Sequence, residues 1–263
     1  MGIVNITPDS FSDGGRFVDM KAAVDTALQM VEDGADLIDV GGESTRPGAP
    51  PVSEAKELDR VVPFIEAFSA ASPAPVSIDT MKPAVARAAC AAGACMWNDV
   101  NALRADGALD VAADLGCDVV LMHMQGEPRT MQANPKYDDV VADVIAFVRA
   151  RAHAAMMSGI AAEKIWIDPG IGFGKTLAHN LALTDAVGAF KEETGFKLLY
   201  GASRKSFIAR IDPAAKDAGE RLGGSIAMAI RAASLGADML RVHDVRETVQ
   251  AMRVWRAMER GES

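Results

Sequence analysis

The sequence has 263 residues, of which 49% are hydrophobic and 24% charged, and its net charge is −9. This composition is typical of a water-soluble protein with a large core, and the acidic balance argues against broad electrostatic binding to nucleic acid or anionic membranes. No apolar run approaches the roughly 20 residues that span a bilayer. The three cysteines form no C-x-x-C pair and no signal peptide is visible, so we expect reduced thiols and a cytoplasmic protein.

Short apolar segments without polar alternation recur along the chain, as expected for strands buried on both faces of a parallel sheet. We predict strands at Gly2–Ile6, Leu37–Gly41, Val76–Asp79, Met96–Val100, Val119–Met122, Ile165–Asp168, Leu198–Gly201 and Met239–Val242. Because the chain opens almost directly on the first strand, we expect a further N-terminal segment to be missing from this sequence.

Amphipathic stretches lie between the predicted strands. We predict helices at Met20–Asp33, Pro83–Ala92, Leu109–Leu115, Tyr137–Met157, Asn180–Phe190, Leu222–Leu235 and Val245–Met258, and one more that begins after Ser53. Ser53 is the expected N-cap of that helix, and Gly34 stands where a helix-terminating glycine is expected.

The alternation of strands and helices predicts an α/β fold, and eight such units in a chain of this length predict a (β/α)8 TIM barrel. An open doubly wound sheet is the alternative. No composition shift or Ser/Gly-rich linker divides the chain, which favours a single domain over residues 1–263.

Functional residues of such barrels lie where the strands run into the loops that follow them. Every predicted strand is followed by polar or charged side chains: Asn5, Gly42–Arg46, Asp79–Thr80, Asn98–Asp99, His123, Asp168, Ser203–Lys205, and Arg241 with His243. Any one of them alone is best explained by a structural role. All eight positions together indicate a site at this rim.

Several other patterns do not support a site of their own. The stretch Gly170–Thr176 resembles a P-loop, but Pro169 stands where that motif needs glycine, so we expect its glycines to let the backbone approach a flat ligand. No dinucleotide fingerprint follows the first strand. His153 and His179 have no partners at metal-ligand spacing, and surface or structural roles are expected for both.

Motifs along nearly the whole chain closely resemble those of the dihydropteroate synthases, pterin-binding enzymes of the folate pathway. They are Asn5–Gly15 (NITPDSFSDGG), Gly41–Gly48 (GGESTRPG), Ser77–Lys82 (SIDTMK), Asn98–Asp99, Leu121–Gly126 (LMHMQG), Asp168–Lys175 (DPGIGFGK), Ser203–Ser206 (SRKS) and Arg241–Asp244 (RVHD). The resemblance implies condensation of 6-hydroxymethyl-7,8-dihydropterin pyrophosphate with 4-aminobenzoate, which gives 7,8-dihydropteroate and pyrophosphate.

The resemblance implies a pterin site made of Asp79, Asn98, Met122, Asp168, Gly201 and Lys205. A carboxylate such as Asp168 suits this task because it can accept hydrogen bonds from both donors on the edge of the pterin. Asp79 and Asn98 would bind the remaining ring nitrogens, Met122 would pack on the ring, and Lys205 would donate to the carbonyl oxygen and N5.

The resemblance also implies a pyrophosphate site made of Asn5, Thr45, Arg241 and His243. An arginine can fork two phosphate oxygens and offset the charge that develops as pyrophosphate leaves. The implied cofactor is Mg²⁺, with the amide oxygen of Asn5 as its protein ligand. Pyrophosphate is expected to leave before the amine attacks, and Asp79 to stabilise the resulting pterin methylene cation.

A 4-aminobenzoate site of Phe11, Thr45, Pro47, Phe173, Lys205 and Ser206 is implied as well. Phe11 and Pro47 would enclose the benzene ring, and Lys205 and Ser206 would lie at its carboxylate. The resemblance also predicts a pair between Asp13 and Arg46 that joins two loops. The predicted catalytic residues are Asp13, Arg46, Asp79, Lys205, Arg241 and His243. Arg204 is left without a role.

Two other functions remain as alternatives: a methyltetrahydrofolate-dependent corrinoid methyltransferase and a non-catalytic pterin-binding protein. The first has no need for the SRKS and TPDSFSDGG loops, and the second would be expected to have lost the anion or Mg²⁺ residues. The resemblance further implies competition between 4-aminobenzoate and the sulfonamides that mimic it. It also implies a homodimer formed through Leu222–Leu235 and Val245–Met258, with no nucleic acid or membrane as partner.

Overall fold

The computed structural model describes residues 1–6, 16–44, 48–127 and 130–261 of the chain, with only the backbone at 16–19. Eight parallel strands form one sheet in chain order. They are β1 (Gly2–Asn5), β2 (Ile38–Gly41), β3 (Val76–Asp79), β4 (Met96–Asp99), β5 (Asp118–Met122), β6 (Ile165–Asp168), β7 (Lys197–Tyr200) and β8 (Met239–Leu240). Each predicted strand is therefore confirmed to within a residue or two at its ends.

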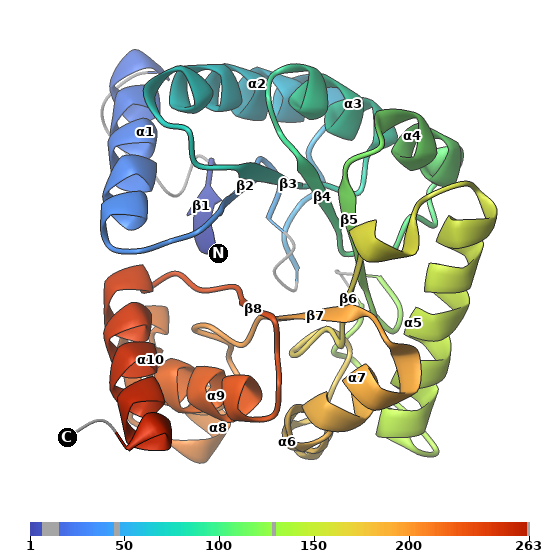
Figure 1. The fold of residues 1–263 in the computed structure, drawn as a ribbon, viewed down its shortest axis with the longest axis vertical. Helices are drawn as coiled ribbons and strands as arrows, with labels where there is room; N and C mark the ends of the chain where they lie inside the picture. The colour runs from blue at the N-terminus through green and yellow to red at the C-terminus, as the bar shows by residue number, and fades with distance from the viewer. Residues whose placement is uncertain (7–15, 45–47, 128–129, 262–263) are drawn as a thin grey trace.

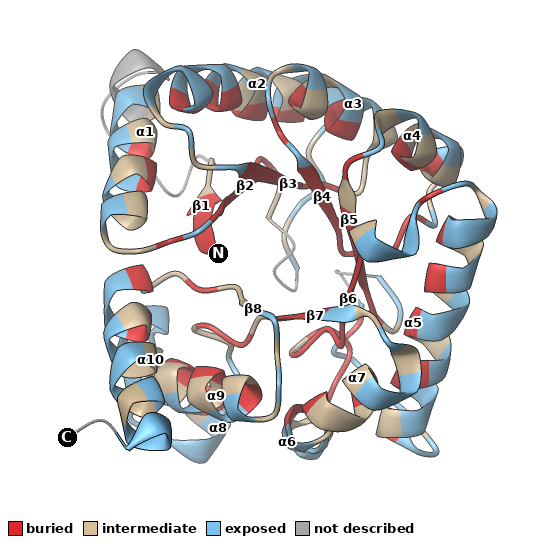
Figure 2. Ribbon diagram, in the orientation of Figure 1, coloured by how far each residue is buried: buried red, intermediate tan, exposed pale blue. Residues whose placement is uncertain are grey.

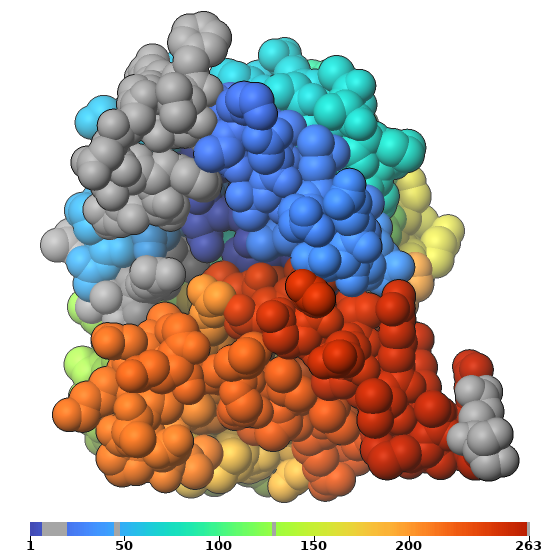
Figure 3. Space-filling model, turned by 90° about the vertical axis from the view of Figure 1, so that its left-hand side faces the viewer, coloured from blue at the N-terminus to red at the C-terminus, as the bar shows by residue number. Residues whose placement is uncertain are grey.

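The sheet closes on itself between its last and first strands. Ile3 N–H donates to the carbonyl of Val242 at 3.0 Å, and Val242 N–H donates to the carbonyl of Met1 at 3.0 Å. Beside this closure the first and last long helices come together, and a Cβ on Gly34 would lie 3.2 Å from Val249 (Figure 3). The closure confirms the predicted (β/α)8 barrel and excludes the open doubly wound sheet.

Helices surround the ring of strands (Figure 1). They are α1 (Arg16–Glu32), α2 (Glu54–Ala71), α3 (Pro83–Ala91), α4 (Ala108–Leu115), α5 (Val140–Met157), α6 (Leu177–Asp185), α7 (Val187–Thr194), α8 (Ile208–Ile211), α9 (Leu222–Ser234) and α10 (Val245–Arg260), with 3-10 turns η2 (Ala162–Lys164) and η3 (Ala218–Arg221). Among the helices of the described residues, none has both the length and the hydropathy needed to cross a bilayer.

Local signals explain several helix ends. Ser53 caps α2 by accepting a hydrogen bond from Lys56 N–H at 3.4 Å, and Gly34 has a φ of 105° after α1, so both predictions are confirmed. The predicted helix Asn180–Phe190 is wrong as one element, because the chain leaves helical geometry at Ala186 (φ −89°, ψ 6°) and continues as α7. The short α8 and η3 were not predicted.

Burial is concentrated on the strands and on the sides of the helices that face them (Figure 2). Inside the barrel, a separate apolar cluster fills one end; its buried members are Met1, Leu37, Met96, Val120, Trp166 and Leu199. We call this cluster the barrel floor. The opposite end, at the carboxyl ends of the strands, carries the polar residues described below.

Candidate active site

The strand register brings the predicted polar residues together at the carboxyl end of the barrel. Asn5, Gly41, Asp79 and Asn98 form one row across β1 to β4, since each pairs with the next. Met122 on β5 pairs with Asp168 on β6 in the same way. The structure thus brings these side chains together at one end of the barrel, as predicted.

A buried ion cluster occupies the centre of this rim. The guanidinium of Arg241 contacts Asp39 Oδ2 at 2.5 Å and Asp79 Oδ2 at 2.6 Å. Asn98 Nδ2 also donates to Asp39, at 3.3 Å to Oδ2. Asp39, which is fully buried, was not predicted as a site residue. A lone aspartate within the apolar strand Ile38–Gly41 was the available signal, because an unpaired charge would not be buried there.

One carboxylate oxygen of Asp79 is buried without a hydrogen-bond partner among the described residues. This oxygen is Oδ1, whereas Oδ2 binds Arg241. Burial raises the pKa of Asp79 to about 7, although the Arg241 charge opposes this. An unpaired buried acceptor is costly, so this oxygen suits a ligand that donates a hydrogen bond to it.

Asp168 is a second buried carboxylate at the rim. Its Oδ1 accepts a hydrogen bond from Gly170 N–H at 2.6 Å. Burial raises its pKa to about 6, while that hydrogen bond and the nearby Lys205 and Arg241 charges lower it. Positive groups therefore surround Asp168 and favour its charged form. In that form the carboxylate can accept hydrogen bonds from a neutral ligand.

Lys175, from the P-loop-like stretch, is buried beneath the same rim. Its Nζ donates to the carbonyls of Phe173 at 2.9 Å and His123 at 3.3 Å and lies 2.9 Å from His123 Nδ1. Burial lowers the pKa of Lys175 to about 7, although Asp168 opposes this. Its three contacts join the loops after β5 and β6.

Two of the three glycines in that stretch lie where two backbone loops come close together. A Cβ on Gly170 would lie 1.9 Å from the carbonyl oxygen of His123, and one on Gly174 would lie 2.6 Å from that of Gln125. Both also have positive φ, 68° and 63°. These glycines let two backbone loops approach each other, and the predicted approach to a flat ligand is not needed to explain them.

An apolar wall stands beside the carboxylates. Its buried members are Val100, Met122, Met124, Met131 and Phe173. Lys205 Nζ lies 4.1 Å from the centre of the Phe173 ring, a cation–π contact. Gly201, four residues before Lys205 in the chain, is half-buried, and Ser206 is exposed. The predicted Lys205, Phe173 and Met122 are thus on one side of the rim.

His243 is positioned by Ser203. The backbone N–H of His243 donates to Ser203 Oγ at 3.1 Å, and its Nδ1 lies 3.0 Å from the same oxygen. The hydroxyl proton is then free to donate to Nδ1, which leaves the ring proton on Nε2. Burial and the charges of Arg241, Arg204 and Lys205 lower the pKa of His243 to about 3. His243 is therefore a neutral hydrogen-bond donor.

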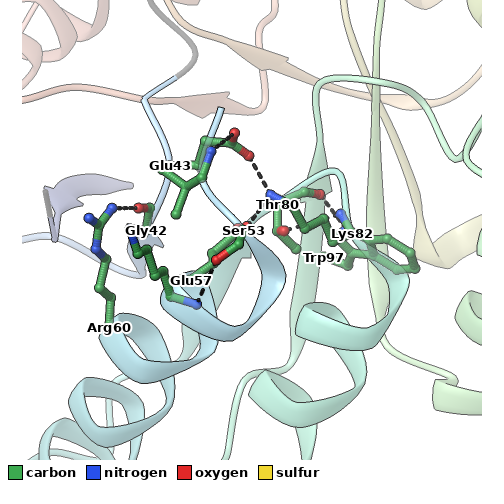
Figure 4. Close-up of polar contacts among 10 residues, drawn as sticks. Gly42, Glu43, Ser53, Glu57, Arg60, Thr80, Lys82 and Trp97 are labelled. Carbon is green, nitrogen blue, oxygen red and sulfur yellow. Dashed lines mark hydrogen bonds and ion pairs between the residues drawn. The ribbon is translucent and has the colours of Figure 1, made fainter. Parts of the chain in front are cut away.

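A second ion cluster lies outside the barrel interior, between β2, α2 and the loop after β3 (Figure 4). Lys82 Nζ contacts Glu43 Oε2 at 2.6 Å and Glu57 Oε2 at 2.5 Å. Glu43 also accepts from Val52 N–H at 2.8 Å, so its side chain joins both ends of the segment 43–52. Glu57 is fully buried, and its Oε1 has no hydrogen-bond partner in the part of the chain that the structure describes.

Some predicted site residues are not tested by these contacts. Phe11, Asp13, Thr45, Arg46 and Pro47 lie outside the described residues. Asn5 is half-buried at the rim. Within the described ranges there is no group of three or more His, Cys, Asp or Glu side chains placed to hold a metal ion. A single amide oxygen would still suit a Mg²⁺ ion that draws its other ligands from phosphate and water.

The barrel with this rim defines a class of protein. Residues 1–243 match the family described as pterin binding enzyme, and the chain belongs to that family. Dihydropteroate synthases are among its relatives in that family. The enzyme of Escherichia coli K12 is 49% identical over 254 residues, which cover 97% of this chain and 89% of that protein.

Two solved structures are also similar over nearly their whole length. The Xanthomonas albilineans dihydropteroate synthase with 4-aminobenzoic acid has a TM-score of 0.92 at 50% identity, covering 98% of this chain and 92% of that one. The Yersinia pestis dihydropteroate synthase with a sulfonamide drug complex has a TM-score of 0.92 at 46% identity, covering 98% and 93%.

Proposed function

We propose that this protein is the dihydropteroate synthase of a folate pathway. It joins 6-hydroxymethyl-7,8-dihydropterin pyrophosphate to 4-aminobenzoate. The bond between the pterin methylene carbon and pyrophosphate breaks, and its electron pair leaves with pyrophosphate. The amine then forms the new C–N bond and releases a proton. The observation that carries the proposal is the pair of buried carboxylates, Asp79 and Asp168, with the free acceptor Asp79 Oδ1 at the barrel mouth.

The pterin fits the polar centre of the rim. Asp168 accepts from the amine and ring N–H on the pterin edge, and Asp79 Oδ1 and Asn98 bind the remaining ring nitrogens. Met122 packs on the ring, Lys205 donates to the carbonyl oxygen and N5, and the lack of a side chain at Gly201 leaves room for the ring. This pairing of donors with buried acceptors removes the cost of the free oxygen.

The leaving group fits the neighbouring positions. His243 donates a neutral hydrogen bond from Nε2, and Asn5 and Thr45 complete the predicted pyrophosphate site. The Arg241 guanidinium is paired with Asp39 and Asp79. We propose that it shares its charge between those carboxylates and a phosphate oxygen. Asn5 would hold Mg²⁺, which would neutralise charge on the pyrophosphate. Asp79, in its ionised form, stabilises the pterin methylene cation.

The second substrate fits the side where the apolar wall meets Lys205. Phe173 borders the benzene ring, and Lys205 and Ser206 bind its carboxylate. Phe11, Thr45 and Pro47 are proposed for the rest of this pocket, and an Asp13–Arg46 pair for joining their two loops. These five assignments depend on the motifs alone.

The deciding assay incubates the protein with pterin pyrophosphate, 4-aminobenzoate and Mg²⁺ and follows both pyrophosphate and dihydropteroate. Equal amounts of the two products are expected. Pterin binding without pyrophosphate release would instead support the non-catalytic alternative, and methyl transfer from methyltetrahydrofolate to a corrinoid would support the other.

Sulfonamides provide a test of the second pocket. Because they carry an aromatic amine and an acidic group like those of 4-aminobenzoate, they should compete with it. Inhibition should therefore weaken as 4-aminobenzoate is raised at fixed pterin pyrophosphate. Inhibition that does not depend on 4-aminobenzoate would contradict a shared pocket.

A homodimer is proposed through α9 and α10. Between these helices lies a groove lined largely by apolar side chains, among them Ile226, Ile230, Trp255, Val254 and Met258. Val254 and Met258 are 56% and 69% exposed. A second copy of the chain would cover them, and light scattering of Met258→Glu against the parent protein tests this. The free thiols at Cys90 and Cys95 support the cytoplasm as the site of action.

A further inference from the structure

Arg204, which neither the sequence nor the proposed reaction gives a role, has an unusual backbone. It lies between Ser203 and Lys205 in the loop after β7, and its φ is 58°. A residue with a side chain is strained in this left-handed region relative to the usual conformation. Such a conformation persists only where the surroundings hold it in place.

Three groups hold Arg204. Its backbone N–H donates to Ser225 Oγ at 2.8 Å, and its carbonyl accepts from Arg221 NH1 at 3.0 Å. Its side chain forks onto Asp244, with Nε 3.0 Å from Oδ2 and NH2 2.5 Å from Oδ1. The fork therefore ties the loop after β7 to the turn that opens α10.

The neighbours of both fork partners are site residues. Lys205 follows Arg204 and lies over Phe173, and Ser203 precedes it and hydrogen-bonds His243. Asp244 follows His243 directly. The Arg204 side chain is 35% exposed to solvent and that of Asp244 17%, and an ion pair with this much exposure contributes little to stability. The pair matters more for geometry than for stability, because Arg204 is followed by Lys205 and Asp244 is preceded by His243, both residues of the site.

We propose that the Arg204–Asp244 fork is a positioning device that sets Lys205 and His243 relative to each other, and so places the pterin and 4-aminobenzoate side of the site against the pyrophosphate side. This inference rests on the proposed function for the roles of Lys205 and His243. Arg204 itself touches neither substrate.

The test compares Arg204→Gln, Asp244→Asn and the double variant with Arg149→Gln, which removes an exposed ion pair with Glu193 elsewhere on the barrel. We expect kcat/KM to fall about 10-fold or more in each fork variant, because small displacements of aligned groups are costly in rate. The double variant should lose no more than either single one, since both break the same contact. Arg204→Lys keeps the charge but cannot fork, so it should restore little.

A second measurement does not depend on activity. Amide hydrogen exchange of peptides covering residues 203–208 and 241–246 should rise together in both single variants and stay unchanged in Arg149→Gln. Exchange that rises in only one segment, or kinetic losses that add in the double variant, would overturn the positioning role. A wild-type protein without synthase activity would instead refute the proposed function, and the exchange result would still decide whether the fork joins the two segments.

Discussion

The two ends of the barrel interior are built by the same strands but have opposite chemistry. Leu37, Met96 and Trp166 lie at the floor, and Asp39, Asn98 and Asp168 lie two residues further along the chain from each of them. The floor is apolar, and the indole N–H of Trp166 is paired with Asp118 at 2.9 Å. At the mouth, burial raises the pKa of Asp79 and Asp168 and lowers that of Lys175. The floor therefore stabilises the fold, whereas the mouth keeps charges that its own surroundings disfavour.

The largest effect is expected at the floor. Trp166→Ala should lower the free energy of unfolding by about 3–5 kcal/mol, because it removes a buried ring and leaves a cavity. Urea denaturation measures this, with Trp166→Phe as the control that keeps most of the ring. A loss below about 1 kcal/mol would mean that the floor is not a main support of the barrel.

At the mouth the expected effect is on binding. Asp168→Asn should weaken pterin binding by about 2–3 kcal/mol, because a charged acceptor is replaced by a neutral one. The amide oxygen can still accept from Gly170 N–H, so the local fold is kept. Calorimetric titration with a pterin measures the loss, and the exposed Asp114→Asn is the matched control. An unchanged dissociation constant would refute the role of Asp168.

In the absence of ligand, the Asp168→Asn variant should have a higher free energy of unfolding than the parent protein. This gain in stability should depend on pH. Asp168 has a folded-state pKa of about 6, above its value of about 3.9 in an unfolded chain. Between these values the folded state binds more protons, so the carboxylate makes folding less favourable as the pH rises. The difference in unfolding free energy should be near zero at pH 4 and grow to about 1–3 kcal/mol above pH 6. A difference that is constant from pH 4 to 8 would contradict it.

The smallest effect is expected at the Glu43–Lys82–Glu57 cluster. Glu57→Gln removes one of two carboxylates that share a single lysine, and Lys82 keeps Glu43 as its partner. The free energy of unfolding should therefore change by about 1 kcal/mol or less. Thermal unfolding beside Glu66→Gln on the same helix measures it. A loss of several kcal/mol would show that Glu57 carries most of the cluster's stabilisation.

The sequence predicted the fold because buried parallel strands appear as continuous apolar runs, and it predicted the rim because polar residues follow each run. It did not predict that Arg241 pairs with Asp39, since that contact joins residues 202 positions apart. The neutral state of His243 was also missed, because it results from burial and from charges on other loops. The break at Ala186 was missed as well, because no proline marks it and Gly188, two residues later, lies inside α7. A role for Arg204 could be proposed only once the structure showed its contact with Asp244, 40 residues later in the chain.

The closure of the ring has a consequence for how the protein is made. Arg241 is followed at once by Val242, whose backbone joins β8 to the first strand. A ribosome adds about 5–20 residues per second, so the roughly 200 residues between Asp39 and Arg241 take on the order of 10–40 s to synthesise. During that interval Asp39 and Asp79 lack the Arg241 guanidinium that pairs with them in the folded protein. The barrel therefore closes and the site assembles in the same step. A chain that ends before Arg241 cannot form the ion cluster of Asp39, Asp79 and Arg241.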